Sequence, residues 1–179
     1  MYLPPIRPGQ VRVGVSLPVP QPWAAEISAA RISYGDEFAE MIPPHITIVG
    51  PTAVWRAEIP NVIKQLDVAV SHIRRFSVSL RGTGTFRPLS EVVFINIDDG
   101  AANCAELEAA CNTGLLANAP RFPYHPHVTL AHDVPPAQLD RATSDFAALH
   151  ARFTADALWL YRQSDDGEWR KACRFELRR

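Results

Sequence analysis

The sequence predicts a single domain of mixed helix and strand, made of two similar units packed about an approximate two-fold axis. Three observations lead to this prediction. Segments with the two-residue alternation of strands alternate with segments of helical spacing along all 179 residues, and no Gly/Ser-rich linker divides them. The pattern Pro-His-aliphatic-Thr-aliphatic occurs twice, at residues 44–48 and 126–130. Each copy is followed by a helix and then a strand, which indicates an internal repeat.

The first half of the chain is predicted to alternate between strand and helix. Alternate residues of segment 11–20 are Val or Leu, which is typical of a strand with one buried face. Segment 21–35 starts with Pro22, a residue suited to a first helical turn, and ends at Gly35, a common helix terminator. The apolar residues of segment 59–75 recur at helical spacing. The expected elements are strand 11–20, helix 21–35, strand 45–50, helix 59–75, strand 76–86 and strand 91–97.

The second half predicts two more helices and three more strands. The alanine-rich segment 101–116 and segment 135–150 have helical spacing, and Asp166-Gly167 is a strong hairpin turn. The expected elements are helix 101–116, strand 127–132, helix 135–150, strand 153–163 and strand 168–179. Glycines 82 and 84, inside an expected strand, indicate a bulge. The internal repeat would cover roughly residues 40–95 and 120–179 of a single 1–179 domain.

Composition limits the classes of partner. A formal net charge of −1 argues against extended DNA binding, which requires a strongly basic surface. We find no apolar run of the ~20 residues that span a bilayer, so no membrane association is expected. Cys104, Cys111 and Cys173 form no Cys-x-x-Cys pair, and the N-terminus lacks the pattern of a signal peptide. We therefore expect a monomer in the reducing cytoplasm, with Cys104 and Cys111 buried on one helix face.

The repeated pattern places the same two polar side chains on one face of each strand. Residues two apart in a strand point the same way, so His45 shares a face with Thr47, and His127 shares a face with Thr129. If the two strands meet at the two-fold axis, the floor of a cleft presents two imidazoles and two hydroxyls. Histidine can act as base or acid near neutral pH, and threonine can donate hydrogen bonds to phosphate oxygens. The set suits an in-line displacement at phosphorus that needs no metal.

Chance does not account for the two copies. With 6 His and 8 Thr, random order gives roughly 0.3 His-x-Thr triplets in the chain. A single triplet would indicate an ordinary core or surface histidine. Two triplets, each preceded by Pro and each opening a predicted strand, favour a catalytic pair.

These residues resemble the motifs of the two-histidine (2H) phosphoesterase superfamily, which contains 2′-5′ RNA ligase-like proteins and cyclic nucleotide phosphodiesterases. Members carry two His-x-Thr/Ser motifs about eighty residues apart, and here positions 45 and 127 are 82 apart. The likeness extends to "GTGTFRP", "EVVFINI", "YHPHVTLAH" and the closing hairpin, over nearly the whole chain. It implies an α+β fold with two lobes, in which antiparallel sheets line a central cleft and helices lie outside.

The resemblance implies a metal-independent enzyme for 2′,3′-cyclic phosphate or 2′-5′ phosphodiester groups of a nucleotide or RNA end. His45 and His127 would be the catalytic acid and base, in either order, and Thr47 and Thr129 would bind the phosphate. No cofactor is implied. Many members have a basic residue soon after the second motif, whereas here His132-Asp133 follows. That difference disfavours long polyanionic substrates.

Four further residues are candidates for substrate binding. Phe122 and Tyr124 precede the second motif and would either stack on a base or pack the approach loop. Arg121, from the same loop, and Arg87, from the opposite lip, would pair with a phosphate or remain solvated.

Two alternatives stay open. A nucleotide- or RNA-end-binding module could keep this fold without turnover. A metallohydrolase could use His125 and His127, with His132 and Asp133 as further ligands, although this interpretation leaves the first motif unexplained.

Overall fold

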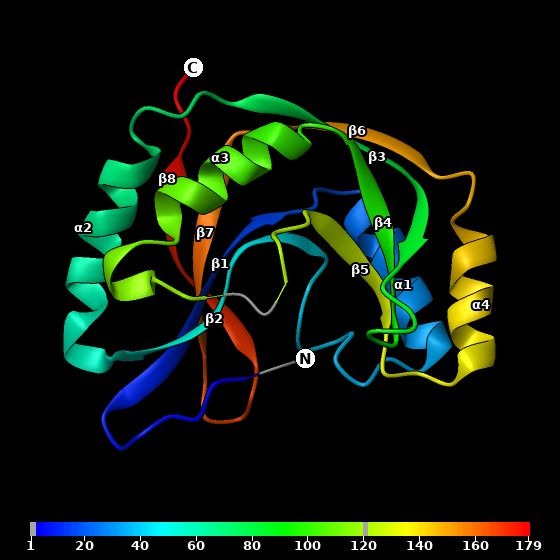
Figure 1. The fold of residues 1–179 in the computed structure, drawn as a ribbon, viewed down its shortest axis with the longest axis horizontal. Helices are drawn as coiled ribbons and strands as arrows, with labels where there is room; N and C mark the ends of the chain where they lie inside the picture. The colour runs from blue at the N-terminus through cyan, green and yellow to red at the C-terminus, as the bar shows by residue number, and fades with distance from the viewer. Residues whose placement is uncertain (1–2, 120–121) are drawn as a thin grey trace.

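The computed structural model describes residues 3–119 and 122–179 (Figure 1). In this part of the chain, four α-helices accompany one eight-stranded antiparallel sheet. The strands are β1 (Gln10–Pro18), β2 (His45–Trp55), β3 (Phe76–Thr85), β4 (Val92–Asp99), β5 (His127–His132), β6 (His150–Ala155), β7 (Ala157–Gln163) and β8 (Trp169–Glu176). The helices are α1 (Trp23–Tyr34), α2 (Ile59–Val70), α3 (Ala101–Cys111) and α4 (Pro136–Asp145).

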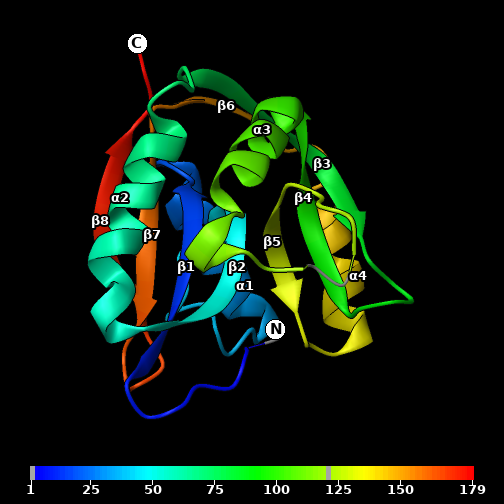
Figure 2. The same cartoon turned by 60° about the vertical axis from the view of Figure 1, so that its left-hand side comes forward.

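The sheet consists of two four-stranded halves that meet at the motif strands. Its order is β6-β3-β4-β5-β2-β1-β7-β8, so β5 and β2 lie at the centre (Figure 2). The halves join through one paired position, Ile46 opposite Val128, whereas the pairs inside each half are longer. The predicted α+β fold, with two equivalent strands meeting at a central cleft, is confirmed.

The helices pack against the sheet in two pairs. Helices α1 and α4 contact each other and β5, while α2 and α3 contact each other and lie against β8 and β2 respectively (Figure 1). Each helix buries apolar side chains completely against the sheet, namely Ile27, Leu66, Leu107 and Leu139. No described helix is long and apolar enough to cross a membrane.

The two-fold relation follows the order of elements. Helix α1 connects β1 to β2 but packs on β5, and α3 connects β4 to β5 but packs on β2. The segment β1–α1–β2–α2 therefore corresponds to β4–α3–β5–α4. The strands that come next, β3 and β6, both lie in the half that contains β5 and pair with each other. Each half is thus assembled from separate parts of the chain.

Several local predictions are confirmed. Helix α1 ends at Gly35, whose φ of 83° suits glycine. Cys104 and Cys111 are buried on one face of α3. Gly82 has a φ of 61° at a register shift between β3 and β4, as expected for a bulge.

The prediction of one strand over residues 153–163 was wrong. The chain forms two strands that separate at Asp156, and β6 pairs with β3 whereas β7 pairs with β1 in the other half. Ala155 and Ala157, on either side, are both buried. The apolar pattern therefore continues across the point where the chain changes its neighbours.

Three predicted helices were too long, and one of them, α3, stops at Cys111 rather than 116. Helix α2 stops at Val70 rather than 75, and α4 stops at Asp145 rather than 150, so that His150 is the first residue of β6. The apolar residues just beyond each end, Ile73 and Phe146, are still buried, but from turns. Burial continues after the helical hydrogen bonds end, and a pattern of apolar residues reports only the burial.

Candidate active site

The two motifs have the same pattern of burial. Ile46 and Ile48 on β2, like Val128 and Leu130 on β5, are almost completely buried in the core. The polar side chains between them are partly exposed on the cleft face, namely His45, Thr47, His127 and Thr129. The alternation is what a strand with one core face requires.

The register of β2 and β5 brings the four polar residues together. Because Ile46 lies directly opposite Val128 in an antiparallel pair, His45 comes opposite Thr129 and Thr47 comes opposite His127. Side chains opposite each other in such a pair have Cβ atoms about 4.5–5.5 Å apart. The register therefore sets one imidazole against one hydroxyl on each side of the central pair.

Both imidazoles are oriented in the same way. His45 Nδ1 lies 2.8 Å from the carbonyl of Pro43, and His127 Nδ1 lies 2.7 Å from the carbonyl of His125. In the neutral ring Nδ1–H donates to this carbonyl, which leaves the lone pair on Nε2. In each motif the intervening residue is proline, whose fixed φ restrains the path of the chain between carbonyl and ring.

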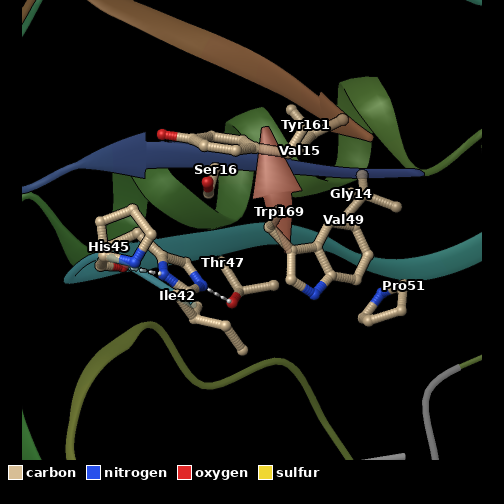
Figure 3. A pocket seen from close by; sticks show the side chains of 11 residues that line it. Gly14, Val15, Ser16, Ile42, His45, Thr47, Val49, Pro51, Tyr161 and Trp169 are labelled. Atoms are coloured by element: carbon tan, nitrogen blue, oxygen red, sulfur yellow. Dashed lines mark hydrogen bonds between the residues drawn. The ribbon is translucent and has the colours of Figure 1, made fainter. Parts of the chain in front are cut away.

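His45 has a close partner in its own motif. Its Nε2 lies 3.1 Å from Thr47 Oγ1, which donates to it when Nε2 is unprotonated (Figure 3). The two side chains line a small cavity of about 60 Å³, together with Ser16, Tyr161 and Trp169.

His127 lies among aromatic rings. The ring of Phe86 meets it edge-on at a centroid distance of 5.0 Å, and that of Phe94 lies 5.2 Å away. Gly84 leaves room for Phe94, since a Cβ there would come 2.7 Å from the Phe94 ring. The sequence interpretation did not identify either phenylalanine, although a glycine inside a strand is a signal of such a close approach.

The surroundings lower the pKa of both histidines. Burial lowers the pKa of His127 to about 4, with the neighbouring His125 and His45 acting in the same direction and the His125 carbonyl opposing them. Burial also lowers the pKa of His45, the Pro43 carbonyl opposes this, and the charge of Arg31 adds to it. Both rings are therefore neutral at pH 7 before a ligand binds, and the effect of His45 on His127 indicates that they lie within electrostatic reach.

A larger cavity of about 450 Å³ opens beside His127. It lies between β2, the loop after β3, helix α3 and the approach to β5, and Thr47 belongs to its wall as well as to that of the small cavity. Its volume falls within the range of sites for small organic ligands, roughly 300–1,000 Å³.

Tyr124 and Phe122, two of the predicted substrate contacts, both line this cavity. The Tyr124 hydroxyl donates to the backbone carbonyl of Thr47 at 2.8 Å, so it connects the approach to β5 with the first motif strand. Phe122 is 47% exposed at the cavity. Ring stacking on a ligand is open to both residues and stays a prediction.

The two predicted arginines have different outcomes. Arg87 pairs with Asp140 of α4 at 2.7 Å and does not contribute to the described wall of either cavity. Arg121 lies outside the described residues.

The candidate metal ligands do not gather into one group. The rings of His125 and His127 have centroids 5.9 Å apart, and His132 Nε2 lies 3.3 Å from Asp133 Oδ2. Across residues 3–119 and 122–179, we find no group of three or more His, Cys, Asp or Glu side chains that could hold a metal ion.

Replacing Tyr124 with phenylalanine is expected to lower the free energy of unfolding by about 1 kcal/mol, because the Thr47 carbonyl loses its donor. Tyr161→Phe is the matched control. Its hydroxyl is buried beside the Ser16 side chain and donates to no backbone carbonyl of the described residues, so its loss is expected to cost less than the loss of the Tyr124 hydroxyl. Urea unfolding of the two variants measures the difference, and equal effects would contradict a structural role for the Tyr124–Thr47 contact.

Comparison with known proteins settles the family. The model of the 2′-5′ RNA ligase superfamily matches residues 18–167, which include both His-x-Thr motifs. The chain belongs to the 2′-5′ RNA ligase superfamily. Among its relatives, a Geobacillus thermodenitrificans protein named "Putative phosphoesterase" is 26% identical over 141 residues, 78% of this chain and 80% of that protein. A Halalkalibacterium halodurans relative with the same type of name is 24% identical over 161 residues, 87% and 91% of the two chains.

Two solved structures share the fold of this superfamily member. E. coli LigT in complex with 3′-AMP has a TM-score of 0.65 at 17% identity and covers 95% of this chain and 99% of its own. TT0787 of Thermus thermophilus has a TM-score of 0.63 at 21% identity, with 93% and 98% coverage. At 17% and 21% identity, the likeness to these two structures is a likeness of fold, that is, of the arrangement of strands and helices.

Proposed function

We propose that this protein is a metal-independent phosphoesterase that acts on 2′,3′-cyclic phosphate or 2′-5′ phosphodiester groups of nucleotides or RNA ends. The observation that carries the proposal is the pairing of Ile46 with Val128. It makes two His-x-Thr motifs neighbours. The Nδ1 atom of each imidazole is held by a backbone carbonyl, and Nε2 of His45 contacts the Thr47 hydroxyl of its own motif. Membership of the 2′-5′ RNA ligase superfamily and relatives named as phosphoesterases support the same reaction class.

In the proposed hydrolysis, one histidine takes a proton from water as the water oxygen bonds to phosphorus. The bond from phosphorus to one ribose oxygen breaks, and the other histidine gives its proton to that oxygen. For a 2′-5′ linkage, a ribose hydroxyl replaces water as the nucleophile, and the reverse step joins two ends. Thr47 and Thr129 donate hydrogen bonds to the non-bridging oxygens, on which charge builds up in the transition state.

The His45–Thr47 contact couples proton transfer to phosphate binding. With Nε2 unprotonated, the Thr47 hydroxyl donates to it at 3.1 Å. Once Nε2 carries a proton, the direction of this hydrogen bond reverses and the hydroxyl hydrogen is released toward a phosphate oxygen. The two states of His45 thus correspond to two orientations of the Thr47 hydroxyl.

The proposal is tested with a panel of 2′,3′-cyclic nucleotides, 2′-5′ dinucleotides and short RNAs with cyclic ends, assayed with EDTA present. Turnover of at least one of these classes in EDTA is the expected result. Loss of all activity in EDTA, with recovery on addition of a divalent metal, would support the metallohydrolase interpretation and overturn ours. LigT has been crystallised with 3′-AMP and with NADP⁺, which makes single nucleotides the natural start of the panel.

The lowered pKa values predict a maximum of kcat/KM on the acidic side of pH 6.5. Catalysis needs one neutral and one protonated imidazole in the free enzyme, and the pKa of His127 is lowered to about 4 while that of His45 is lowered too. Above the higher of the two pKa values, the fraction of free enzyme that carries one protonated imidazole decreases about tenfold per pH unit. The value of kcat/KM decreases with that fraction. A bound phosphate stabilises imidazolium, so the optimum of kcat lies at higher pH. A kcat/KM maximum above pH 8 would contradict these assignments.

We also propose that the protein acts as a monomer in the cytoplasm. The three cysteines are free thiols, as a reducing compartment requires. Burial raises the pKa of Cys104 and of Cys111 to about 12, so both thiols stay protonated and unreactive.

A further inference from the structure

The wall of the larger cavity combines apolar rings with one carboxylate. Phe86, Leu89 and Phe122 are its partly exposed apolar residues, and the nearly buried Ile48 and Val49 also line it. Among the described residues that line it, Glu108 is the side chain that is charged at neutral pH. A carboxylate is unexpected beside the candidate site for an anionic phosphate, because like charges repel. Its presence indicates that the ligand has a second, hydrogen-bond-donating part.

Glu108 is held in place from α3 and keeps capacity for a ligand. Its Oε1 accepts a hydrogen bond from Asn112 Nδ2 at 2.8 Å. Asn112 also donates to the carbonyl of Asn118 at 3.0 Å and accepts from its amide at 2.7 Å, which fastens the loop after α3. A carboxylate has about four acceptor positions, so a ligand could still donate two hydrogen bonds to Glu108.

Glu108 also lies near the first motif. Burial raises the pKa of Tyr124, and the nearby Cys104 and Glu108 raise it further. The same Tyr124 hydroxyl bonds to the Thr47 carbonyl. The carboxylate, the connecting tyrosine and the phosphate-binding strand are therefore parts of one wall.

The rim of the cavity favours a flat ring. Leu89 and Phe122 are large apolar side chains left 74% and 47% exposed, and both belong to this cavity. Phe86, deeper in the wall, also contacts His127. Aromatic and aliphatic surfaces of this kind bind nucleobases by stacking, which is insensitive to sequence and leaves selectivity to the polar groups.

We propose that the larger cavity is a nucleobase subsite that selects guanine through Glu108. Guanine presents two adjacent donors, N1–H and N2–H, which match the two oxygens of one carboxylate, whereas the Watson–Crick edges of adenine, cytosine and uracil offer no such pair. The proposal rests on the phosphoesterase function above and narrows it to guanosine 2′,3′-cyclic phosphate and related mononucleotides. Additional phosphates of a longer chain would be repelled by Glu108.

Binding of four ligands tests the selection. The 3′-monophosphates of guanosine, adenosine, cytidine and uridine are titrated calorimetrically into wild type, Glu108→Gln and Glu106→Gln. Wild type is expected to bind 3′-GMP roughly 10- to 100-fold more tightly than the other three, the discrimination of one good bidentate contact. Glu108→Gln is expected to lose this preference. Glu106→Gln removes the same charge from an exposed position of α3 outside the described wall and is expected to keep it.

The outcomes separate this inference from the proposed function. The glutamine at position 108 retains an oxygen for Asn112, and thermal unfolding checks that the variant folds. Equal affinity of wild type for all four nucleotides would overturn the guanine subsite whatever the variant does, as would an unchanged preference in Glu108→Gln. Selective binding of 3′-GMP without turnover of any cyclic nucleotide would keep the subsite and overturn the phosphoesterase. Turnover of cyclic nucleotides with no preference among the four bases would keep the phosphoesterase function and overturn the guanine subsite.

Discussion

Replacement of His127 with alanine is expected to reduce turnover of a 2′,3′-cyclic nucleotide by roughly 10²–10⁴-fold, the contribution of one positioned proton-transfer group. His45→Ala is expected to have a loss of similar size. Each variant leaves the second imidazole without a partner for the opposite proton transfer. The double variant should therefore lose much less than the product of the two single effects, because the pair acts as a unit.

The matched control is His72→Ala. His72 is exposed in the turn after α2, outside the lining of both cavities, so the same substitution there should leave turnover unchanged. Initial rates with EDTA present, together with circular dichroism and thermal unfolding, separate loss of chemistry from loss of fold. Both motif histidines are partly exposed on the cleft face, so their removal should cause little unfolding.

The same variants discriminate between an enzyme and a binding module. A binding module would bind nucleotides and show no difference in product formation between wild type and His127→Ala. Near-normal turnover in either single variant would remove that histidine from the mechanism. If only one histidine proved essential, the two-fold proposal would reduce to a site with one catalytic imidazole.

The sequence was sufficient to predict the centre of the molecule. Period-two alternation around His45 and His127 identified the faces of β2 and β5, and the duplication indicated that these strands meet. Both inferences depend on local pattern and symmetry, which a single sequence contains.

The residues around that centre could not be predicted in the same way. Phe86 and Phe94 reach His127 because β4 pairs with β5, a pairing between segments that no local pattern specifies. Glu108 enters the cavity because α3 packs on the half of the sheet opposite to the strand it follows. The crossing at Asp156 was missed for the same reason, since hydrophobic alternation records burial and not the identity of the neighbour.

Asp36→Ala is expected to lower the free energy of unfolding by about 3–5 kcal/mol, because it leaves a buried guanidinium without its carboxylate. Arg31 Nε lies 2.9 Å from Asp36 Oδ2, and the two side chains are only 5% and 1% exposed. The other side of the guanidinium donates to the carbonyl of Ile42 at 2.6 Å. The pair therefore fastens the loop that leads from α1 to His45.

Denaturant unfolding of Asp36→Ala, Arg31→Met and the double variant measures this effect. The double variant should be less destabilised than the sum of the single changes, since no unpaired charge remains buried. Glu168→Ala provides the exposed counterpart. It breaks the ion pair with Arg170 at 2.8 Å, in which the side chains are 48% and 59% exposed, and should change the free energy of unfolding far less than Asp36→Ala does. Similar losses at the two sites would contradict the buried character of the Arg31–Asp36 pair.

The pair also connects stability with the chemistry of the first motif. The charge of Arg31 lowers the pKa of His45, and Asp36 compensates part of that charge. Asp36→Ala should therefore move the pKa of His45 further down, and Arg31→Met should move it up, as measured by NMR titration of the ring. Shifts in opposite directions from two variants that both destabilise the fold would separate electrostatic control of His45 from a general loosening of the loop. Shifts in the same direction would show that loop position, and not charge, sets the protonation of this histidine.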